Sequence, residues 1–381
     1  MLSSAHKTRV VFSVTNCICH DQRVLKVAET VSKLDCDITI IGIKSGDSCD
    51  LEKIPFRTKR FKMLFRKGFL FYKFFNIRLF FYLLLHKYDL LVSNDLDTLL
   101  PNFLVSKLKR NLLVYDSHEY FTGVPEIQHR PFVKLVWKSI EKIIFPHLVN
   151  IITVSDSIAL QYEREYGIRP VTIRNCSRKT DGIIPYSRGK LGIDPDHFLI
   201  IMQGAGINVD RGGEELVEAV SMTENVSLLI VGSGLMLSAL KNKVSELNIS
   251  DRVRFVPKVP WEELIRYTKS VDVGLSLDKN TNMNYQFSLP NKLFDYMSAG
   301  IPVIASDLPE VKNILMEYNC GMIIPAVTPK IISDAITELK NNKVKLAVLK
   351  KNAREASTKI NWEIESEKVK EFYSRVLHKN G

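Results

Sequence analysis

The sequence predicts an α/β protein with two doubly wound domains, each a parallel β-sheet with helices on both faces. Runs rich in Val and Ile alternate with helix-length amphipathic segments, which is the pattern of βαβ units. This alternation stops near the middle of the chain and then starts again. The 381 residues also exceed what one ordinary core accommodates, so two domains are the simplest interpretation.

The expected strands form two series. The first comprises residues 9–14, 37–43, 88–93, 111–115 and 150–154, and the second comprises 198–202, 226–231, 253–256, 271–275 and 302–305. A stretch rich in turn formers, residues 181–189, separates them, and we place the domain boundary at 185/186. Ligands of doubly wound sheets bind beyond the carboxyl ends of the strands, so the loops there are the candidate functional segments.

The net charge of +11 is concentrated in the first half of the chain. Residues 1–196 contain 30 Lys and Arg against 20 Asp and Glu, whereas the remainder contains 23 against 22. A nucleic acid, an anionic membrane surface or a phosphorylated acceptor would each explain this asymmetry. No recognised basic-aromatic module accompanies the charge, so we expect no nucleic-acid partner.

The cysteines and the beginning of the chain favour a cytoplasmic location. Six scattered cysteines without paired C-x-x-C motifs indicate reduced thiols rather than a zinc site or a disulfide framework. The first residues run into an expected strand without the order of charged, apolar and small residues that marks a signal peptide.

An aromatic and basic segment covers residues 61–87. Between residues 61 and 86 it has ten Phe or Tyr and no acidic residue. At 100° per residue five polar side chains fall within an arc of about 80°, which leaves the rest of the circumference mostly apolar: Lys62, Arg66, Lys73, Asn76 and Lys87. The longest uncharged apolar run, residues 79–85, is too short to span a bilayer. We therefore expect an amphipathic helix, either inserted at an anionic membrane surface or packed on the first sheet with a basic solvent face.

Glycine-rich loops follow the first two strands of the second series. Gly204 and Gly206 lie in the first loop, ahead of Arg211, and Gly232 lies in the second. Backbone N–H groups at a helix N-terminus together with an arginine suit a diphosphate. The spacing does not match the dinucleotide fingerprint. The alternative is that these glycines serve only tight turns.

The segment at residues 288–307 is the most specific one. Pro290 suits the first turn of a helix and Gly300 its end. Lys292 and Asp295 are three residues apart and therefore share one face. Either they form a surface ion pair, or Asp295 accepts hydrogen bonds from ribose hydroxyls while Lys292 meets a phosphate.

Residues 289–310, LPNKLFDYMSAGIPVIASDLPE, closely resemble the donor-site segment of GT-B-fold glycosyltransferases of family 4. The resemblance extends over nearly the whole chain through residues 21–24, 115–119, 153–155, 174–175, 210–213 and the closing helix of residues 362–377. It implies two Rossmann-like domains facing each other across a cleft. The N-terminal acceptor-binding domain would comprise residues 1–185 with the C-terminal helix of residues 362–381, and the C-terminal donor-binding domain residues 186–361.

The resemblance also implies roles for individual residues. Gly204, Gly206, Arg211, Gly232, Lys292, Leu293 and Asp295 would bind a nucleotide-sugar donor, and Asp21, Arg23, Asp116 and Glu119 would lie on the acceptor side. His118 would polarise the acceptor hydroxyl, while Arg211 and Lys292 would stabilise the departing diphosphate. The implied reaction transfers a hexose to a lipid-linked or saccharide acceptor, with retention of configuration, in bacterial surface polysaccharide or glycolipid synthesis. The enzyme would be cytoplasmic, with peripheral contact at the inner face of the cell membrane through residues 61–87.

Two departures from the family pattern affect these roles. Phe287 occupies the place of the first of two family glutamates eight positions apart, which puts the donor-sugar contact and the stereochemistry in doubt. The loop at residues 15–20 lacks the family's glycines.

Asp95-Leu96-Asp97 resembles the metal clamp of a different glycosyltransferase fold. Because it lies in the acceptor half, and cations and helix dipoles commonly replace the metal in GT-B enzymes, we expect neither metal nor cofactor.

Two alternatives share the architecture. A sugar-nucleotide epimerase would act on UDP-sugar without an acceptor, and a catalytically silent nucleotide-sugar binder is compatible with Phe287. The aromatic and basic segment favours the transferase, because a soluble epimerase needs no surface that faces a membrane.

Overall fold

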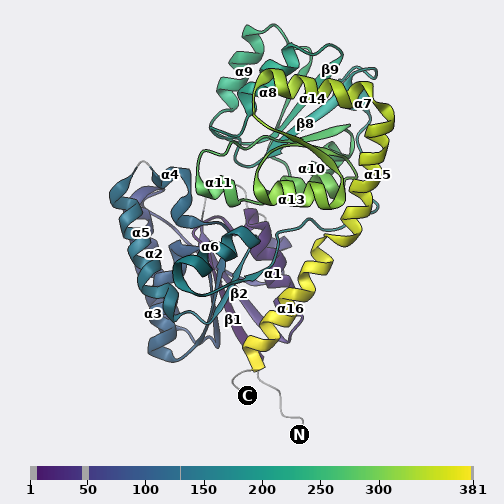
Figure 1. Cartoon of the computed structure of the whole chain (residues 1–381). Coiled ribbons are helices and arrows are strands. Elements are labelled where there is room, and N and C mark those ends of the chain that lie inside the picture. Colours follow the sequence, from purple (N-terminus) through teal and green to yellow (C-terminus); the bar gives the residue numbers. More distant parts are fainter. Residues whose placement is uncertain (1–6, 45–50, 129, 379–381) are drawn as a thin grey trace. The chain divides into compact units, whose positions relative to one another are not determined.

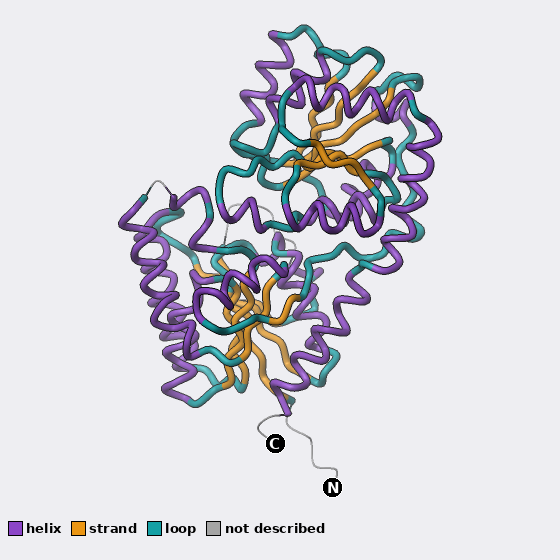
Figure 2. Tube along the Cα trace, viewed as in Figure 1, coloured by secondary structure: helices purple, strands orange, loops and turns teal. Residues whose placement is uncertain are grey.

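A computed structural model describes residues 7–44, 51–128 and 130–378. The chain divides into two compact units, residues 1–175 with 365–381 and residues 176–364. Residues 176–185 pack on the second unit, where the Thr180 hydroxyl donates to the Ser298 carbonyl at 2.6 Å and the Lys269 ammonium donates to the Ile183 carbonyl at 3.0 Å. Figures 1 and 2 show a twisted sheet flanked by helices in each unit.

The first unit contains a seven-stranded parallel sheet in the order β3-β2-β1-β4-β5-β6-β7. Its strands are β1 (Thr8–Ser13), β2 (Cys36–Ile43), β3 (Arg57–Phe61), β4 (Leu90–Asn94), β5 (Leu112–Ser117), β6 (Asn150–Thr153) and β7 (Val171–Thr172). Its α-helices are α1 (Gln22–Ser32), α2 (Gly68–Leu85), α3 (Leu99–Lys109), α4 (Pro125–Gln128), α5 (Pro131–Ile144) and α6 (Asp156–Tyr166), and α16 (Trp362–His378) belongs to it from residue 365 onward. In Figure 1, α2, α3 and α5 lie together along one side of this sheet.

The second unit contains a six-stranded parallel sheet in the order β10-β9-β8-β11-β12-β13. Its strands are β8 (Phe198–Gly204), β9 (Val226–Gly232), β10 (Val253–Pro257), β11 (Val273–Ser276), β12 (Val303–Ser306) and β13 (Gly321–Ile324). Its α-helices are α7 (Arg188–Leu191), α8 (Gly213–Ser221), α9 (Leu237–Glu246), α10 (Trp261–Lys269), α11 (Met283–Phe287), α12 (Asn291–Ser298), α13 (Pro309–Tyr318), α14 (Pro329–Asn341) and α15 (Lys343–Lys359).

The strand order of both sheets reverses at one point. In the first sheet β1, β2 and β3 follow one another toward one edge, whereas β4 to β7 follow one another toward the opposite edge, so the order reverses between β1 and β4. In the second sheet the order reverses in the same way between β8 and β11. Side chains in the loops after these four strands gather at the carboxyl edge of the sheet, which is where doubly wound proteins bind ligands. The fold thus selects the loops that follow β1 and β4 in one unit and β8 and β11 in the other.

Three strands were not expected from the sequence. β3 is an edge strand with alternating exposed basic residues, Arg57 and Lys59, and only Phe61 is buried. Edge strands accept such charges because one side of their backbone faces solvent. β7 has two residues, and β13 begins at a glycine and is only partly buried. A search for apolar runs therefore overlooks all three.

The helix in the aromatic and basic segment is apolar on both faces, which corrects the expected single basic face. α2 begins at Gly68 and ends at Leu85, so Lys62, Arg66 and Lys87 lie outside it. Its inner face buries Phe71, Phe75, Leu79 and Leu83, the last three against a core that includes Val11, Ile41 and Leu91. Burial of each such side chain contributes about 1.5–3 kcal/mol. Its outer face exposes mainly apolar side chains, together with Lys73 and Arg78.

Four cysteines are buried free thiols: Cys17, Cys36, Cys176 and Cys320. Burial raises the pKa of Cys36 to about 11 and that of Cys320 to about 12, which keeps both thiols protonated and unreactive. The expectation that all six cysteines are reduced is wrong for Cys19, which is disulfide-bonded. Cys49 lies outside the described residues.

Candidate functional site

Two cations at the carboxyl edge of the second sheet share one buried carboxylate. Arg211 follows β8, Asp278 follows β11, and Lys292 lies in the first turn of α12. In this cluster Arg211 Nη1 lies 3.0 Å from Asp278 Oδ2, and Lys292 Nζ lies 3.6 Å from Asp278 Oδ1. The Asp278 side chain is fully buried, whereas the Arg211 and Lys292 side chains are 24% and 13% exposed. The cluster therefore presents net positive charge to solvent.

The electrostatics of this cluster follow from burial and charge. Although burial alone would raise it, the Lys292 ammonium and the Arg211 guanidinium hold the pKa of Asp278 below its usual value. Burial, together with the Arg211 cation, lowers the pKa of Lys292. Two cations with one anion at partly solvent-accessible positions form a site for an anionic ligand.

The loop after β8 is built to bring Arg211 to this edge. Gly212 has φ +73°, and a Cβ at this position would lie 2.5 Å from the Cβ of Leu277, so only glycine fits. The Arg211 guanidinium lies 4.1 Å from the centre of the Tyr285 ring, which supports it by a cation–π contact. Asp278 and Tyr285 were not predicted as site residues from the sequence, because neither belongs to a recognisable motif.

The two glycine-rich loops pack on each other. Ser233 N–H donates to the Gly204 carbonyl at 3.1 Å, and Ile207 N–H donates to the Ser233 carbonyl at 2.9 Å. A Cβ at Gly232 would lie 1.8 Å from Gly204 O, so this glycine is required by the close approach of the loops. Gly206 is exposed, and a Cβ there would meet only Asn208 Nδ2 at 3.8 Å. The structure thus brings these glycines to the same edge as Arg211, with open space beside Gly206.

Asp295 also lies in α12, but its hydrogen-bond partners differ from the carboxylate of Asp278 that faces Lys292. Its Oδ1 accepts from the Ser177 hydroxyl at 2.5 Å and the Trp261 indole at 3.0 Å, and its Oδ2 accepts from the Gln203 amide at 3.0 Å. The residue is 7% exposed. These donors come from three separate segments, which is why spacing along the sequence did not reveal them.

Two other residues of this segment are placed by packing. Leu293 is fully buried in the core of the second unit, so its side chain does not line the carboxyl edge. Phe287 ends α11 at an intermediate exposure. Its aromatic ring carries no carboxylate to bind a sugar hydroxyl, which is consistent with the departure seen in the sequence.

The first unit gathers a histidine and two aspartates at its carboxyl edge. His118 follows β5, its Nδ1 lies 3.4 Å from Asp95 Oδ2, and its Nε2 lies 3.5 Å from Asp116 Oδ2. Its backbone N–H donates to Asp95 Oδ1 at 2.8 Å. Burial alone would lower the pKa of His118, but the Asp95 and Asp116 charges raise it to about 9. At neutral pH the ring is therefore an imidazolium, whose two N–H groups are available as hydrogen-bond donors.

Asp97 extends this cluster. Its Oδ2 accepts from the Thr15 hydroxyl at 2.5 Å, and its carbonyl accepts from the Asn76 amide of α2 at 2.9 Å. Burial and the nearby Asp95 charge raise the pKa of Asp97 to about 8, so this carboxyl is mostly protonated at neutral pH. A neutral carboxyl is a poor ligand for a cation, and the described residues contain no cluster of three or more His, Cys, Asp or Glu able to hold a metal.

The other predicted acceptor-side residues have structural partners. Arg23 and Asp116 form a buried ion pair, with Nη2 2.8 Å from Oδ1 and exposures of 3% and 0%. Asp21 caps α1 by accepting from the Val24 N–H at 3.0 Å. Glu119 is partly exposed beside His118. The edge therefore offers His118 and Glu119 to a ligand more readily than Arg23 or Asp116.

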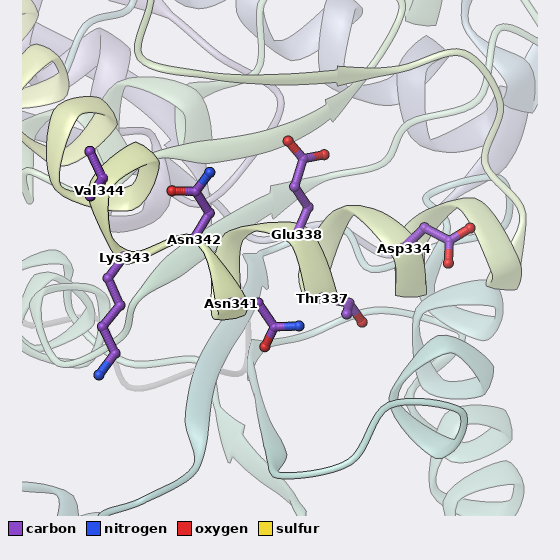
Figure 3. Close-up of a pocket in the computed structure, with 7 residues that line it drawn as sticks. All are labelled: Asp334, Thr337, Glu338, Asn341, Asn342, Lys343 and Val344. Carbon is purple, nitrogen blue, oxygen red and sulfur yellow. The ribbon is translucent and has the colours of Figure 1, made fainter.

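A groove of about 730 Å³ lies elsewhere, where α14 meets α15 (Figure 3). Its lining includes Asp334, which pairs with Lys330, and Glu338, which pairs with Lys345. These side chains are exposed surface pairs, so the groove lacks the convergent buried polar groups of the two carboxyl edges.

Family models cover most of the chain. Residues 184–356 match the model described as Glycosyl transferases group 1, and residues 21–176 match Glycosyltransferase Family 4. A curated relative, chitobiosyldiphosphodolichol beta-mannosyltransferase of Candida albicans, is 25% identical over an alignment of 273 residues that covers 64% of this chain and 58% of the relative. The chain thus aligns with little more than half of that protein.

Solved structures share the fold over nearly the full length. Sucrose-phosphate synthase from Thermosynechococcus elongatus superposes with a TM-score of 0.78 at 19% identity, covering 97% of this chain and 99% of the other. Anabaena HepE in complex with UDP-glucose superposes with a TM-score of 0.76 at 16% identity, covering 96% and 99%. The parallel sheets of seven and six strands are those of the GT-B fold, and the chain is a glycosyltransferase of family 4.

Proposed function

We propose that this glycosyltransferase moves a hexose from a nucleoside diphosphate sugar to a hydroxyl group of a lipid-linked saccharide, with retention of the anomeric configuration. The observation that carries the donor half is the Arg211–Asp278–Lys292 cluster beside the loop at Gly206. Cations at the carboxyl edge of a doubly wound sheet suit a diphosphate, and they stabilise the charge that grows on it as the sugar leaves.

Asp278 positions the two cations and leaves both able to bind a ligand. Because it is buried and shared, it neutralises one unit of charge and holds Arg211 and Lys292 at the same edge. Diphosphate oxygens would complete the coordination of both cations. Asp295 would accept hydrogen bonds from the ribose hydroxyls, which then replace one or more of its donors Ser177, Trp261 and Gln203.

The chemistry of the first unit supports proton transfer to the leaving group. In the reaction, the bond between the anomeric carbon and the diphosphate oxygen breaks and a bond to the acceptor oxygen forms. His118 is already protonated at neutral pH, so it orients the acceptor as a hydrogen-bond donor and does not remove its proton. The acceptor proton passes to the departing diphosphate, which gains basicity as the bond breaks. Delivery from the same face yields retention.

The lipid-linked acceptor is supported by the position of α2. This helix presents an apolar outer face, and its Asn76 holds the Asp97 carbonyl of the acceptor-side loop. An acceptor carried on a lipid would therefore approach the edge that contains His118. The similar C. albicans protein bears a name that specifies a diphosphodolichol-linked saccharide, which is the same acceptor class.

Thermal denaturation with UDP, GDP and ADP tests the donor site first. A ligand at 100 times its dissociation constant stabilises the native state by about 2.7 kcal/mol. We expect stabilisation by one of the three that disappears in Asp295→Ala and persists in Asp307→Ala, an exposed control on the same segment. The matching sugar nucleotide is then incubated with and without a lipid-diphosphate disaccharide. Product only with the acceptor supports transfer, and an altered sugar without acceptor would indicate an epimerase.

A further inference from the structure

We infer that α2, α3 and α5 together form a docking surface for an anionic lipid bilayer. Large apolar side chains are exposed on all three helices. They are Phe69, Leu70, Phe74, Ile77, Phe81 and Leu85 on α2, Leu100, Leu104 and Leu108 on α3, and Phe132, Leu135 and Ile143 on α5, each 36–78% exposed. Soluble proteins seldom expose so many large apolar residues on adjoining elements.

The three helices adjoin one another, so these side chains belong to one surface. Lys109 of α3 donates to the Leu84 carbonyl near the end of α2 at 3.1 Å. Tyr72 of α2 contacts Trp137 of α5 edge to face, with ring centres 5.3 Å apart. Figure 1 shows the three helices lying together on the same side of the first sheet. We call this the three-helix surface.

The charges on the three-helix surface are of one sign. Exposed basic residues accompany the apolar ones: Lys73 and Arg78 on α2, Lys107 on α3, and Lys134 and Lys142 on α5. The sole acidic residue in the three helices, Glu141, is fully buried and paired with Lys138. Apolar side chains with an entirely basic exposed complement match a membrane interface that contains anionic lipid.

This charge pattern argues against a second copy of the chain as the occupant. A two-fold dimer places the same patch against itself, so its lysines would face lysines. An anionic bilayer instead supplies both the apolar interior and the counter-charge. The three-helix surface is therefore more complementary to an anionic bilayer than to the same surface on a second copy of the chain.

The geometry also argues that α2 lies on the membrane and does not cross it. The uncharged run of residues 79–85 is too short to span a bilayer, but α2 as a whole is long and apolar enough, with a mean hydropathy of 1.4 over 18 residues. However, it connects the parallel strands β3 and β4, and its inner residues Phe75, Leu79 and Leu83 belong to the core of the first unit. Crossing the bilayer would remove this core, whereas peripheral binding leaves it intact.

Vesicle flotation of the full chain tests the inference. We expect the protein to float with vesicles of phosphatidylcholine containing phosphatidylglycerol, and to float much less with phosphatidylcholine alone or at high salt. The variant Leu104→Ser/Leu108→Ser/Leu135→Ser should reduce the partition coefficient about tenfold or more. Its control, Leu235→Ser/Met316→Ser/Val344→Ser, removes apolar residues of the second unit that are more exposed, at 66–84% against 43–65%, and should bind as the wild type does.

Substitution of lysines tests the electrostatic contribution to vesicle binding separately from the apolar contribution. Lys73→Gln/Lys107→Gln/Lys134→Gln should weaken binding to the anionic vesicles, whereas the exposed set Lys258→Gln/Lys343→Gln/Lys359→Gln should not. Circular dichroism checks that each variant folds. If one of the two three-helix variants does not fold, the other variant and its matched control still test the inference.

Three results would overturn the inference. The first is equal flotation of the three-helix variants and the wild type. The second is a concentration-dependent dimer in sedimentation velocity that the three-helix variants abolish, because the occupant would then be a second copy. The third is membrane association that alkaline carbonate does not release, which would indicate a span. None of these measurements involves nucleotide or sugar transfer, so failure here is distinguishable from failure of the proposed function.

Discussion

Asp95 holds His118 through two contacts, one to the backbone and one to the ring. Its Oδ1 accepts the His118 N–H at 2.8 Å, and its Oδ2 lies 3.4 Å from Nδ1. Asp95 adopts φ +59° and ψ 170°, a backbone region that costs a non-glycine residue of order 1–3 kcal/mol. The strained conformation places this carboxylate against the ring, so Asp95 is a positioning residue for His118.

Asp95→Asn should lower the pKa of His118. The present value of about 9 depends on the charges of Asp95 and Asp116, and loss of one opposite charge at this distance changes a pKa by about 1–3 units. Titration of the His118 ring resonance by NMR measures the change. Asp194→Asn, which removes a carboxylate 4.0 Å from His197, should leave His118 unaffected. A wild-type pKa near 6.5 would contradict this electrostatic account.

The protonation of His118 should also make stability depend on pH. Its pKa is raised on folding from 6.5 to about 9, so the contribution of the imidazolium is fully present below pH 6.5 and is lost as pH rises through 9. Urea denaturation at pH 6, 8 and 9.5 should show the free energy of unfolding of the wild type falling across this window. His118→Gln should flatten that part of the curve, and a parallel fall in the variant would assign the effect to other groups.

The same protonation gives an expectation for the reaction. If the imidazolium donates to the acceptor, kcat/KM should fall as pH rises through about 9, because the donor form is lost. A rise with this apparent pKa would instead make neutral His118 a base and contradict the proposed proton path. The anomeric configuration of the product, read by NMR, tests retention independently.

Arg23→Met should lower the free energy of unfolding, because Arg23 is held by buried structural partners and is less available to an acceptor. Arg23 lies in α1, and its guanidinium donates to Asp116 and, at 2.9 Å, to the Ile173 carbonyl, with only 3% of its side chain exposed. Removing one partner of a buried ion pair costs about 3–5 kcal/mol. Urea denaturation measures the loss. The double variant Arg23→Met/Asp116→Asn removes both charges of the pair, while Asp95 still faces His118, and should recover part of the stability. No recovery would mean that the pair is not coupled.

The sequence predicts the sheets well and the partners of the site residues poorly. Apolar runs located ten strands because parallel strands buried on both faces are continuous in sequence. Asp278, by contrast, is one aspartate in a loop, and it becomes a site residue only because β11 lies beside β8. The spacing of Lys292 and Asp295 correctly indicates that both lie in one helix. Helical geometry does not reveal that Lys292 pairs with Asp278 whereas Asp295 accepts a hydrogen bond from Gln203.

The outer face of α2 shows the same limit. Its many apolar residues are visible in the sequence, yet the expected polar arc depended on Lys62, Arg66 and Lys87, which lie beyond the ends of the helix. Asn76, also assigned to that arc, donates to the carbonyl of Asp97. Helix boundaries decide which residues share a face, and these boundaries come from tertiary packing.

Asp278→Asn should raise the response of the protein to a nucleoside diphosphate while lowering its basal stability. Without the Asp278 charge, Arg211 and Lys292 are two partly exposed cations without their shared anion, which costs less than the roughly 3–5 kcal/mol of a fully buried pair. A diphosphate that binds both cations restores a counter-charge. The thermal shift produced by the nucleotide that stabilises the wild type should therefore be larger in Asp278→Asn, although the unliganded Tm is lower.

The matched control for this variant is Asp272→Asn. Asp272 pairs with Arg188 at 2.6 Å and Lys350 at 3.0 Å in the same unit, so its loss also breaks a shared carboxylate between two cations. We expect a lower Tm but an unchanged shift with nucleotide, because those cations belong to no glycine-rich loop. If Asp278→Asn and Asp272→Asn respond alike, the cations at the carboxyl edge are structural and the diphosphate binds elsewhere.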